Sequence, residues 1–175
     1  MKKIFYLLLF SVTIGSFTAC NKDNDLEVWR EANTDAYEAI KKNSEYRPLR
    51  TATGPEGVYY KILEQGTGTE HPIQTSKVKV LYKGTYYNGS VFDAGSSGND
   101  IPVEFLTGGT VRGFSFALQN MVVGDKWEIW IPYYLGYGAA GYTMPNYYSY
   151  SYETIIKGYT TLVFEVELVS ITQYP

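Results

Sequence analysis

The strongest constraint on the fold of this chain is a set of short segments in which every second position is apolar. Such alternation occurs over residues 77–82, 127–131 and 162–169. Because successive side chains of a strand point to opposite faces, each segment predicts a strand that presents one face to a core. The positions expected on the core face are Val78, Val80, Tyr82, Trp127, Ile129, Ile131, Leu162, Phe164, Val166 and Leu168.

Turn and helix signals complete the predicted architecture. Asn88-Gly89 lies between Tyr87 and Val91 and is typical of a tight turn between antiparallel strands. Only one segment of this region, residues 114–121, is predicted as a helix, because it follows Gly113 and ends before a Val-Gly-Asp turn. We find no internal repeat and no glycine-rich phosphate loop. The pattern predicts an α+β fold in which one short helix crosses an antiparallel sheet.

The first nineteen residues are typical of a signal peptide. Lys2 and Lys3 precede an apolar run over residues 4–14, and small residues follow at 16–19. The apolar run is too short to span a bilayer with margin. The small residues after it lead directly to the only cysteine, Cys20. The surrounding SFTAC resembles a bacterial lipobox, which implies cleavage before Cys20 and acylation of its thiol and new amino group. The alternative is an ordinary secretory signal beside a coincidental cysteine.

Residues 21–54 are expected to connect this anchor to the main domain. Residues 21–25 are polar and predict a solvated tether, and residues 43–55 contain Pro48, Gly54 and Pro55 and predict a linker. Between them, residues 26–40 have an apolar stripe at helical spacing. That stripe either docks on the main domain or pairs with a second copy, and we favour docking.

Charge and residue types exclude several functions. A net charge of -3 provides no basic face for phosphates, so we expect no nucleic-acid partner. With one histidine, His71, and no thiol left after lipidation, we predict neither a catalytic triad nor a metal site, and we expect His71 on the surface. Asp93 and Glu104 are conceivable as a carboxylate pair for glycoside cleavage, but their spacing does not favour it.

Aromatic residues supply the positive signal. They make up 17% of the chain and include 18 tyrosines, which are rings that pack on one side and hydrogen-bond at the tip. Such a composition indicates that the protein binds something apolar but hydrated.

The order of the motifs resembles that of the FKBP-type peptidyl-prolyl isomerases. The matching runs are VKVLYKGTYYNGSVFDAG, VEFLTGGTVRGFSFALQNMVVGDKWEIWIP, LGYGAAG and TIIKGYTTLVFEVELVSI. The similarity covers about residues 57–171, roughly two thirds of the 175 residues. Each motif alone is weak, but their shared order is specific.

The resemblance implies a five- or six-stranded antiparallel sheet wrapped around a short helix, with an aromatic pocket that holds proline. It implies that Phe114 forms the floor, that Asp93 lies at the rim, and that the Tyr137 hydroxyl and the Val111 backbone N–H donate hydrogen bonds to the substrate. It also implies a set of walls: Tyr82, Phe92, Phe105, Val111, Ile156 and Phe164. For each aromatic residue the alternative is ordinary core packing.

Three departures from the family pattern bear on activity. The floor is Phe114 where the family usually has tryptophan, and the arginine that commonly follows Asp93 is missing from AGSSGN. The usual IPP before the last strand is replaced by Ile156-Lys157-Gly158, after an enlarged loop, YTMPNYYSYSYET. We expect this loop to overhang the pocket with five tyrosines: Tyr142, Tyr147, Tyr148, Tyr150 and Tyr152. The loop either binds an unfolded chain, packs on itself or closes the pocket.

The sequence therefore predicts a signal peptide at 1–19, a lipidated tether, helix and linker at 20–54, and an FKBP-like domain at 55–175. We predict a peptidyl-prolyl cis-trans isomerase that assists folding of exported proteins, with proline-containing polypeptides as partners and no cofactor. It would be anchored by lipid to a bacterial membrane, namely the outer membrane, at its periplasmic or its cell-surface face. The alternatives are a holdase that uses the tyrosine loop without turnover, and a surface glycan-binding protein. Clients and oligomeric state are not indicated.

Overall fold

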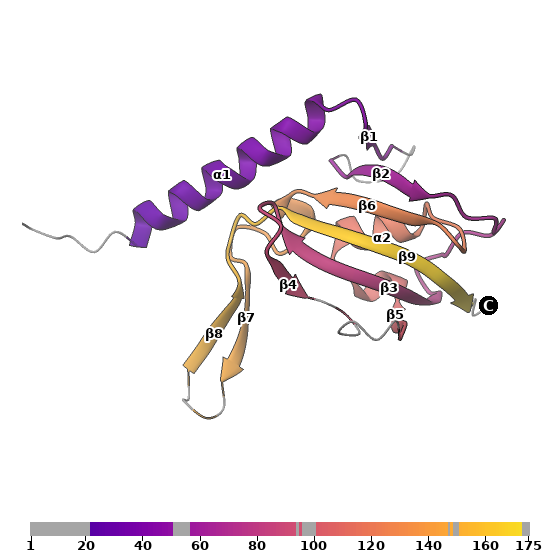
Figure 1. Cartoon of the computed structure of the whole chain (residues 1–175). Helices are drawn as coiled ribbons and strands as arrows, with labels where there is room; N and C mark the ends of the chain where they lie inside the picture. Colours follow the sequence, from indigo (N-terminus) through magenta and orange to yellow (C-terminus); the bar gives the residue numbers. More distant parts are fainter. Residues whose placement is uncertain are drawn as a thin grey trace, which may run out of the picture.

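In a computed structural model, residues 22–50, 57–93, 95, 101–146, 148 and 151–172 are described. Over these residues the chain forms a seven-stranded antiparallel sheet in the order β1-β2-β6-β9-β3-β4, with β5 paired to the other half of β3 (Figure 1). The strands are β1 (Arg47–Pro48), β2 (Tyr59–Glu64), β3 (Lys77–Tyr86), β4 (Val91–Asp93), β5 (Val103–Leu106), β6 (Lys126–Ile131) and β9 (Leu162–Thr172). The predicted α+β class is confirmed.

The alternating segments form the centre of the sheet. β9 pairs with β3 along almost its whole length, from Leu162 opposite Tyr86 to Thr172 opposite Lys77, and with β6 on its other side. The alternate apolar positions of these strands are buried, as predicted, apart from Tyr82, which is half-buried. Tyr82 is the position at which the core face opens into a cavity.

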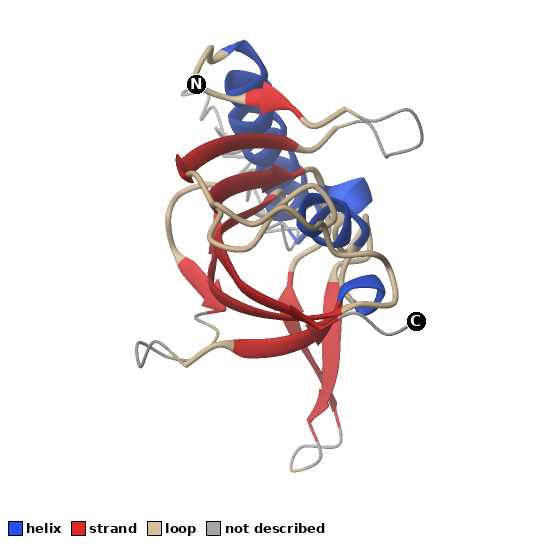
Figure 2. Ribbon diagram, turned by 90° about the vertical axis from the view of Figure 1, so that its right-hand side faces the viewer, coloured by secondary structure: helices blue, strands red, loops and turns tan. Residues whose placement is uncertain are grey.

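The short helix α2 (Arg112–Leu118) packs against one face of the curved sheet (Figure 2). A Cβ atom at Gly113 would lie 2.3 Å from Ile131 Cγ2, so the glycine lets the helix approach β6 closely. The predicted helix, 114–121, begins two residues late and ends three residues late. Its last residues instead make tighter turns, with Asn120 N bonded to Ala117 O at 2.9 Å and Met121 N to Leu118 O at 3.1 Å.

The amino-terminal helix α1 (Lys22–Lys42) docks on the same chain, which confirms the favoured interpretation. Asn33 is 1% exposed, and its Oδ1 accepts a hydrogen bond from Thr161 N at 2.8 Å, just before β9 begins. Tyr37 is buried and donates to the backbone oxygen of Gly57, just before β2. α1 thus crosses the end of the sheet at which these strands begin. It starts at Lys22, so most of the predicted tether is helical.

Two connections differ from the sequence prediction. The enlarged loop forms a separate antiparallel hairpin, β7 (Tyr142–Asn146) and β8 (Ser151–Ile156), which projects from the main body (Figure 1). The first half of the predicted linker contains β1, and Leu49 N bonds to Val58 O at 2.8 Å. Two 3-10 turns, η1 (Thr107–Gly109) and η2 (Tyr133–Leu135), complete the described elements.

The predicted signal peptide and Cys20 lie outside the described residues, as do Gly54, Pro55, most of the AGSSGN segment, Tyr147 and Tyr150. Within the described part of the chain, no helix has the length and apolar character needed to cross a membrane.

Candidate active site

A cavity of about 330 Å³ opens between α2 and the sheet at Tyr82. Its lining comes from β3, β4, β5, the η1–α2 connection, α2, the segment after η2, β7 and β9. The lining residues are Tyr82, Asp93, Phe105, Gly109, Thr110, Val111, Phe114, Tyr137, Tyr142 and Phe164. A volume of this size suits one small ring or side chain with its neighbouring backbone.

Aromatic rings form the base of this cavity. Phe114, at the start of α2, is 4% exposed, and its ring centroid lies 4.9 Å from that of Phe164 and 6.3 Å from that of Phe105. Tyr82 contacts the same group, with its ring 5.5 Å from Phe105 and 6.2 Å from Phe164. The rings meet at tilted or edge-to-face angles, which favours a fixed arrangement over a loose one.

Tyr82 and Asp93 are joined at the rim. The Tyr82 hydroxyl donates to Asp93 Oδ2 at 2.8 Å, and Gly95 N donates to Asp93 Oδ1 at 3.0 Å. Gly95 has φ +57°, and a Cβ atom there would lie 2.8 Å from the Tyr82 backbone oxygen. Both carboxylate oxygens therefore have neutral donors, and no lysine or arginine among the described residues forms an ion pair with Asp93. The Tyr82 hydroxyl and the Gly95 N–H thus donate to Asp93, which lacks the arginine that commonly follows it in the family.

Two phenols in the cavity remain neutral to high pH. Burial, and then the hydrogen bond to Asp93, raises the pKa of Tyr82 well above its ordinary value. Burial also raises the pKa of Tyr137, with smaller contributions from Tyr142 and Asp93. A neutral phenol keeps its O–H, so the Tyr137 hydroxyl can serve as a hydrogen-bond donor.

Tyr137 is held by the hairpin. Its ring stacks on Tyr142, with centroids 5.2 Å apart and an interplanar angle of 26°. Tyr142 is the first residue of β7 and pairs with Ile156 at the base of the hairpin. The enlarged hairpin therefore contributes one tyrosine to the cavity wall.

A backbone donor lies at the start of α2. The Val111 carbonyl accepts the first helical hydrogen bond from Ser115 N at 3.0 Å, while the Val111 N–H bonds to no other described residue. The preceding turn is fixed by Thr107, whose N and Oγ1 both donate to Ser76 O, at 2.9 and 3.0 Å. Val111 N–H is thus a free donor on a rigid turn beside the cavity.

The structure brings seven of the nine predicted site residues to the cavity: Tyr82, Asp93, Phe105, Val111, Phe114, Tyr137 and Phe164. The other two lie behind it. Phe92 is half-buried, with its ring 5.6 Å from Phe164, and Ile156 is 2% exposed in the core opposite Tyr142. They support lining residues instead of facing the cavity.

Two lining residues, Gly109 and Thr110, have no counterpart in the sequence prediction, while a third, Tyr142, is predicted only at the pocket mouth. The sequence contains no local signal for the first two, because they line the cavity only through the turn that precedes α2. Tyr142 was expected with four other tyrosines over the mouth. Met144 and Tyr148, farther along the hairpin, are exposed and do not line the cavity.

The structure does not assemble the other sites considered. Glu104 is not part of the cavity lining and forms an ion pair with Lys77 at 3.2 Å, so it does not face Asp93 across a sugar-sized cleft. His71 is exposed, as predicted, with Nδ1 3.0 Å from Met121 O. Among the described residues, no three His, Cys, Asp or Glu side chains are grouped closely enough to hold a metal ion.

The fold and the cavity together define a class: a small antiparallel sheet wrapped around one short helix, with a ring-lined cavity between them. The family model described as FKBP-type peptidyl-prolyl cis-trans isomerase matches residues 68–169, and the chain belongs to this family.

Three related proteins illustrate the similarity. The FKBP-type 22 kDa peptidyl-prolyl cis-trans isomerase of Escherichia coli K12 is 38% identical over 117 residues, which are 66% of this chain and 50% of that protein. The outer membrane protein MIP of Legionella longbeachae is 33% identical over 67% of this chain and 45% of that protein. The chain thus spans about half the length of the curated relatives it matches. The crystal structure of a peptidyl-prolyl cis-trans isomerase from Pseudomonas syringae superposes with a TM-score of 0.68 and 30% identity, covering 84% of this chain and 96% of that one.

Proposed function

We propose that this chain is a peptidyl-prolyl cis-trans isomerase that acts on proline-containing polypeptides and assists the folding of exported proteins. The observation that carries the proposal is the cavity: it has an aromatic base, and the Tyr137 O–H and the Val111 N–H stand beside it. Membership of the family supports the same reaction.

The reaction needs no covalent chemistry. Rotating a peptide bond costs about 18–20 kcal/mol because the twisted bond loses amide resonance. The twisted amide has a less polar carbonyl than the planar one. A cavity that removes water therefore disfavours the planar ground state more than the transition state, which lowers the barrier.

Each lining residue has a part in this proposal. The prolyl ring lies on Phe114, between walls formed by Tyr82, Phe105 and Phe164. The Tyr137 hydroxyl and the Val111 N–H hold carbonyl oxygens of the substrate while the bond turns. Asp93 acts by fixing the orientation of Tyr82.

Isomerisation kinetics on a short X-Pro peptide test this function. We expect the purified chain to accelerate the exchange. Tyr137→Phe keeps the ring and removes one hydrogen bond, so it should lower kcat/KM by about fivefold to tenfold. Phe114→Ala should remove most of the activity, and because truncating a buried phenylalanine to alanine costs about 3–5 kcal/mol of stability, its folded fraction must be measured alongside.

A matched control is Tyr59→Phe, on β2 outside the cavity, which should leave the rate unchanged. No acceleration by the wild-type chain would reject the proposed activity. Equal rates for wild type and both cavity variants, in folded protein, would reject the proposed site.

The hairpin supports a second function, that of a holdase that binds unfolded chains. Met144 is 48% exposed and Tyr148 is exposed near the tip, on the same hairpin whose Tyr142 reaches the cavity. In this second proposal, the two exposed side chains form part of the apolar surface that an unfolded chain contacts. We expect Met144→Ser with Tyr148→Ser to weaken suppression of client aggregation while short-peptide isomerisation persists.

The control for the holdase is Val28→Ser with Ile73→Ser, two exposed apolar residues on other segments. Equal loss of suppression in both double variants would argue against a hairpin surface. The glycan-binding alternative is tested by a carbohydrate array, on which any specific hit would favour it over both.

We also propose, from the sequence, that the chain is exported and lipid-anchored through Cys20, with residues 1–19 as signal peptide, 20–54 as anchor, helix and linker, and 55–175 as the isomerase domain. Two acyl groups are sufficient for stable membrane attachment. Labelling with a radioactive fatty acid should mark the wild-type chain and not Cys20→Ala. Labelling that survives this substitution would contradict the anchor.

A further inference from the structure

A continuous series of ring contacts leads from α1 to the floor of the cavity. The Trp29 ring lies 5.5 Å from Tyr86, Tyr86 lies 5.2 Å from Phe92, and Phe92 lies 5.6 Å from Phe164. Phe164 in turn lies 4.9 Å from Phe114. We call these five residues the aromatic series; it begins outside the family match of residues 68–169 and ends at the cavity floor.

Trp29 is fixed at the start of this series by the connection between β8 and β9. Its Nε1 donates to Thr160 Oγ1 at 3.1 Å, and Lys157 Nζ lies 5.4 Å from its ring centroid. One helical turn later, Asn33 holds the backbone N of Thr161. These contacts hold the residues just before β9, and Phe164 is the third residue of that strand.

The second residue of the series, Tyr86, also reaches the hairpin that carries Tyr142. The Tyr86 hydroxyl donates to Ile155 O at 3.3 Å. The next residue, Ile156, is paired with Tyr142, which lines the cavity and stacks on Tyr137. Trp29 therefore packs on a residue that touches two walls of the cavity, one through Phe92 and one through the hairpin base.

The surroundings of Tyr86 show why a brace is needed. Tyr86 is the last residue of β3, Phe92 lies on a three-residue edge strand, and both rings are only half-buried. The Phe92 ring lies directly on the backbone of Gly84, where a Cβ atom would be 2.7 Å from Phe92 Cζ, and its remaining ring contacts are with Tyr86 and Phe164. Rings at the end of a sheet that lack close packing on one side move more freely than core rings.

We propose that Trp29 is a positioning residue for the isomerase cavity, and that α1, by docking in cis, braces the Phe164 wall through Phe92 and the hairpin wall through Tyr86. This inference rests on the proposed function for its kinetic consequence but not for its structural one. Preorganised walls raise affinity because the substrate does not have to order them on binding. Loss of the Trp29 ring should therefore weaken substrate binding more than it lowers the rate at which bound substrate isomerises.

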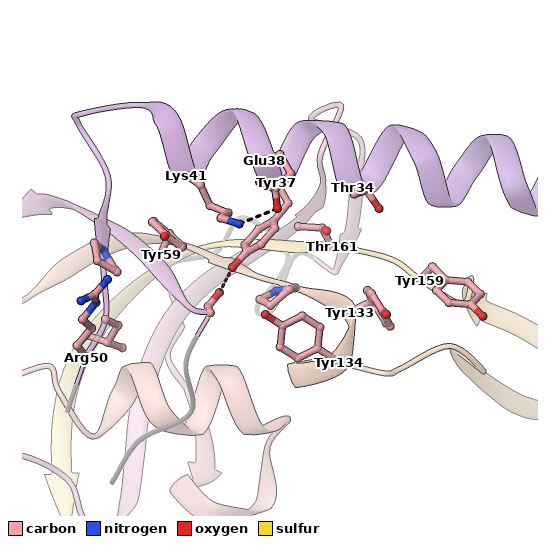
Figure 3. Close-up of a pocket in the computed structure, with 14 residues that line it drawn as sticks. Thr34, Tyr37, Glu38, Lys41, Arg50, Tyr59, Tyr133, Tyr134, Tyr159 and Thr161 are labelled. Carbon is pink, nitrogen blue, oxygen red and sulfur yellow. Dashed lines mark hydrogen bonds and ion pairs between the residues drawn. The ribbon is translucent and has the colours of Figure 1, made fainter. Parts of the chain in front are cut away.

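The other end of α1 provides the matched control. There, Tyr37 donates to Gly57 O and lies among Tyr59, Tyr133 and Tyr134 (Figure 3). Figure 3 also shows Lys41 paired with Glu38, at 2.8 Å. Tyr37 fastens this end of the helix to the domain, and its ring contact is with Tyr59, outside the aromatic series. Tyr37→Phe thus disturbs docking without touching the series.

The test compares Trp29→Ala, Trp29→Phe and Tyr37→Phe in the full chain. Trp29→Ala should raise KM for an X-Pro peptide on the order of tenfold with a much smaller change in kcat. Trp29→Phe, which keeps a ring against Tyr86, should restore KM to within about twofold. Tyr37→Phe should leave KM unchanged, even where it lowers the melting temperature.

A second readout needs no activity: the NMR resonances of the Phe114 and Phe164 ring protons. We expect them to shift in Trp29→Ala and not in Tyr37→Phe.

A wild-type chain without isomerase activity would overturn the proposed function, while the ring resonances would still decide the positioning role. If Trp29→Ala does not fold, Trp29→Leu carries the same expectations. Unshifted rings with unchanged KM, or equal effects of the Trp29 and Tyr37 variants, would overturn the inference.

Discussion

The ring at the cavity floor is the residue on which the proposed reaction depends most. Phe114 is 4% exposed and contacts Phe164, Tyr82 and Phe105, so it is both a core residue and the surface on which a prolyl ring would rest. Family resemblance identified this position, and local pattern did not, because a phenylalanine at a helix start is usually only core.

Enlarging this ring should increase turnover. The family usually has tryptophan here, and Phe114 faces an open cavity of about 330 Å³. We expect Phe114→Trp to raise kcat/KM about threefold, because more apolar surface covers the prolyl ring, at a stability cost of about 1–3 kcal/mol if the indole crowds the core. Peptide isomerisation and thermal unfolding measure the two effects. A folded variant with reduced kcat/KM would contradict the role of ring area.

The two raised phenol pKa values predict how the rate depends on pH. Burial is the first cause for both Tyr82 and Tyr137, and it favours the neutral form in the folded chain. Their contribution to stability is therefore fully present below the ordinary pKa of 10.0 and is lost as pH rises through the higher folded values. We expect kcat/KM to stay level between about pH 7 and about pH 9. A decline within that range would contradict a neutral Tyr137 donor.

At the scale of elements, the central strands were predictable and their irregular neighbours were not. β3, β6 and β9 follow from alternation, because each has one face in the core. The sequence predicts a loop where β7 and β8 lie, because their residues, which include Pro145, show no apolar alternation. The two strands pair only with each other. A hairpin that buries neither face leaves no hydrophobic pattern in the sequence from which its strands could be predicted.

Gly84, on β3, makes room for the rings of Phe92 and Phe164 to pack directly on that strand. A Cβ atom there would come within 2.7 Å of Phe92 Cζ and 2.9 Å of Phe164 Cε1. We expect Gly84→Ala to push both rings away, lower the free energy of unfolding by about 1–3 kcal/mol and reduce kcat/KM, since Phe164 lines the cavity. Chemical denaturation and peptide kinetics measure these changes.

The control for Gly84→Ala is Lys83→Ala, an exposed neighbour on the same strand. It should leave both quantities within experimental error. If Gly84→Ala behaved like Lys83→Ala, the two rings would have room that their distances to the glycine do not indicate.

At the scale of the whole molecule, the question is whether α1 is part of the folded unit. Its helical stripe was predictable, but its partners were not, because Asn33 and Thr161 are separated by 128 positions and no periodicity links them. The same limit applies to Trp29, whose contacts lie at Tyr86, Lys157 and Thr160. Tertiary contacts of this kind are decided by shape and hydrogen bonding across the finished sheet.

Asn33 provides the test, because its side-chain amide is buried and makes two hydrogen bonds. Its Oδ1 accepts from Thr161 N, its Nδ2 donates to Trp29 O at 2.8 Å, and the residue is 1% exposed. Replacement by alanine leaves the Thr161 N–H without that partner under the helix, which costs about 1–3 kcal/mol.

If α1 and the sheet fold as one unit, Asn33→Ala should shift a single unfolding transition, seen alike by helix circular dichroism and by tryptophan fluorescence. Asp35→Ala, on the exposed face of the same helix, should not shift it. Two separate transitions in the wild-type chain would mean that the helix detaches before the sheet unfolds, and that the brace on the cavity is lost first.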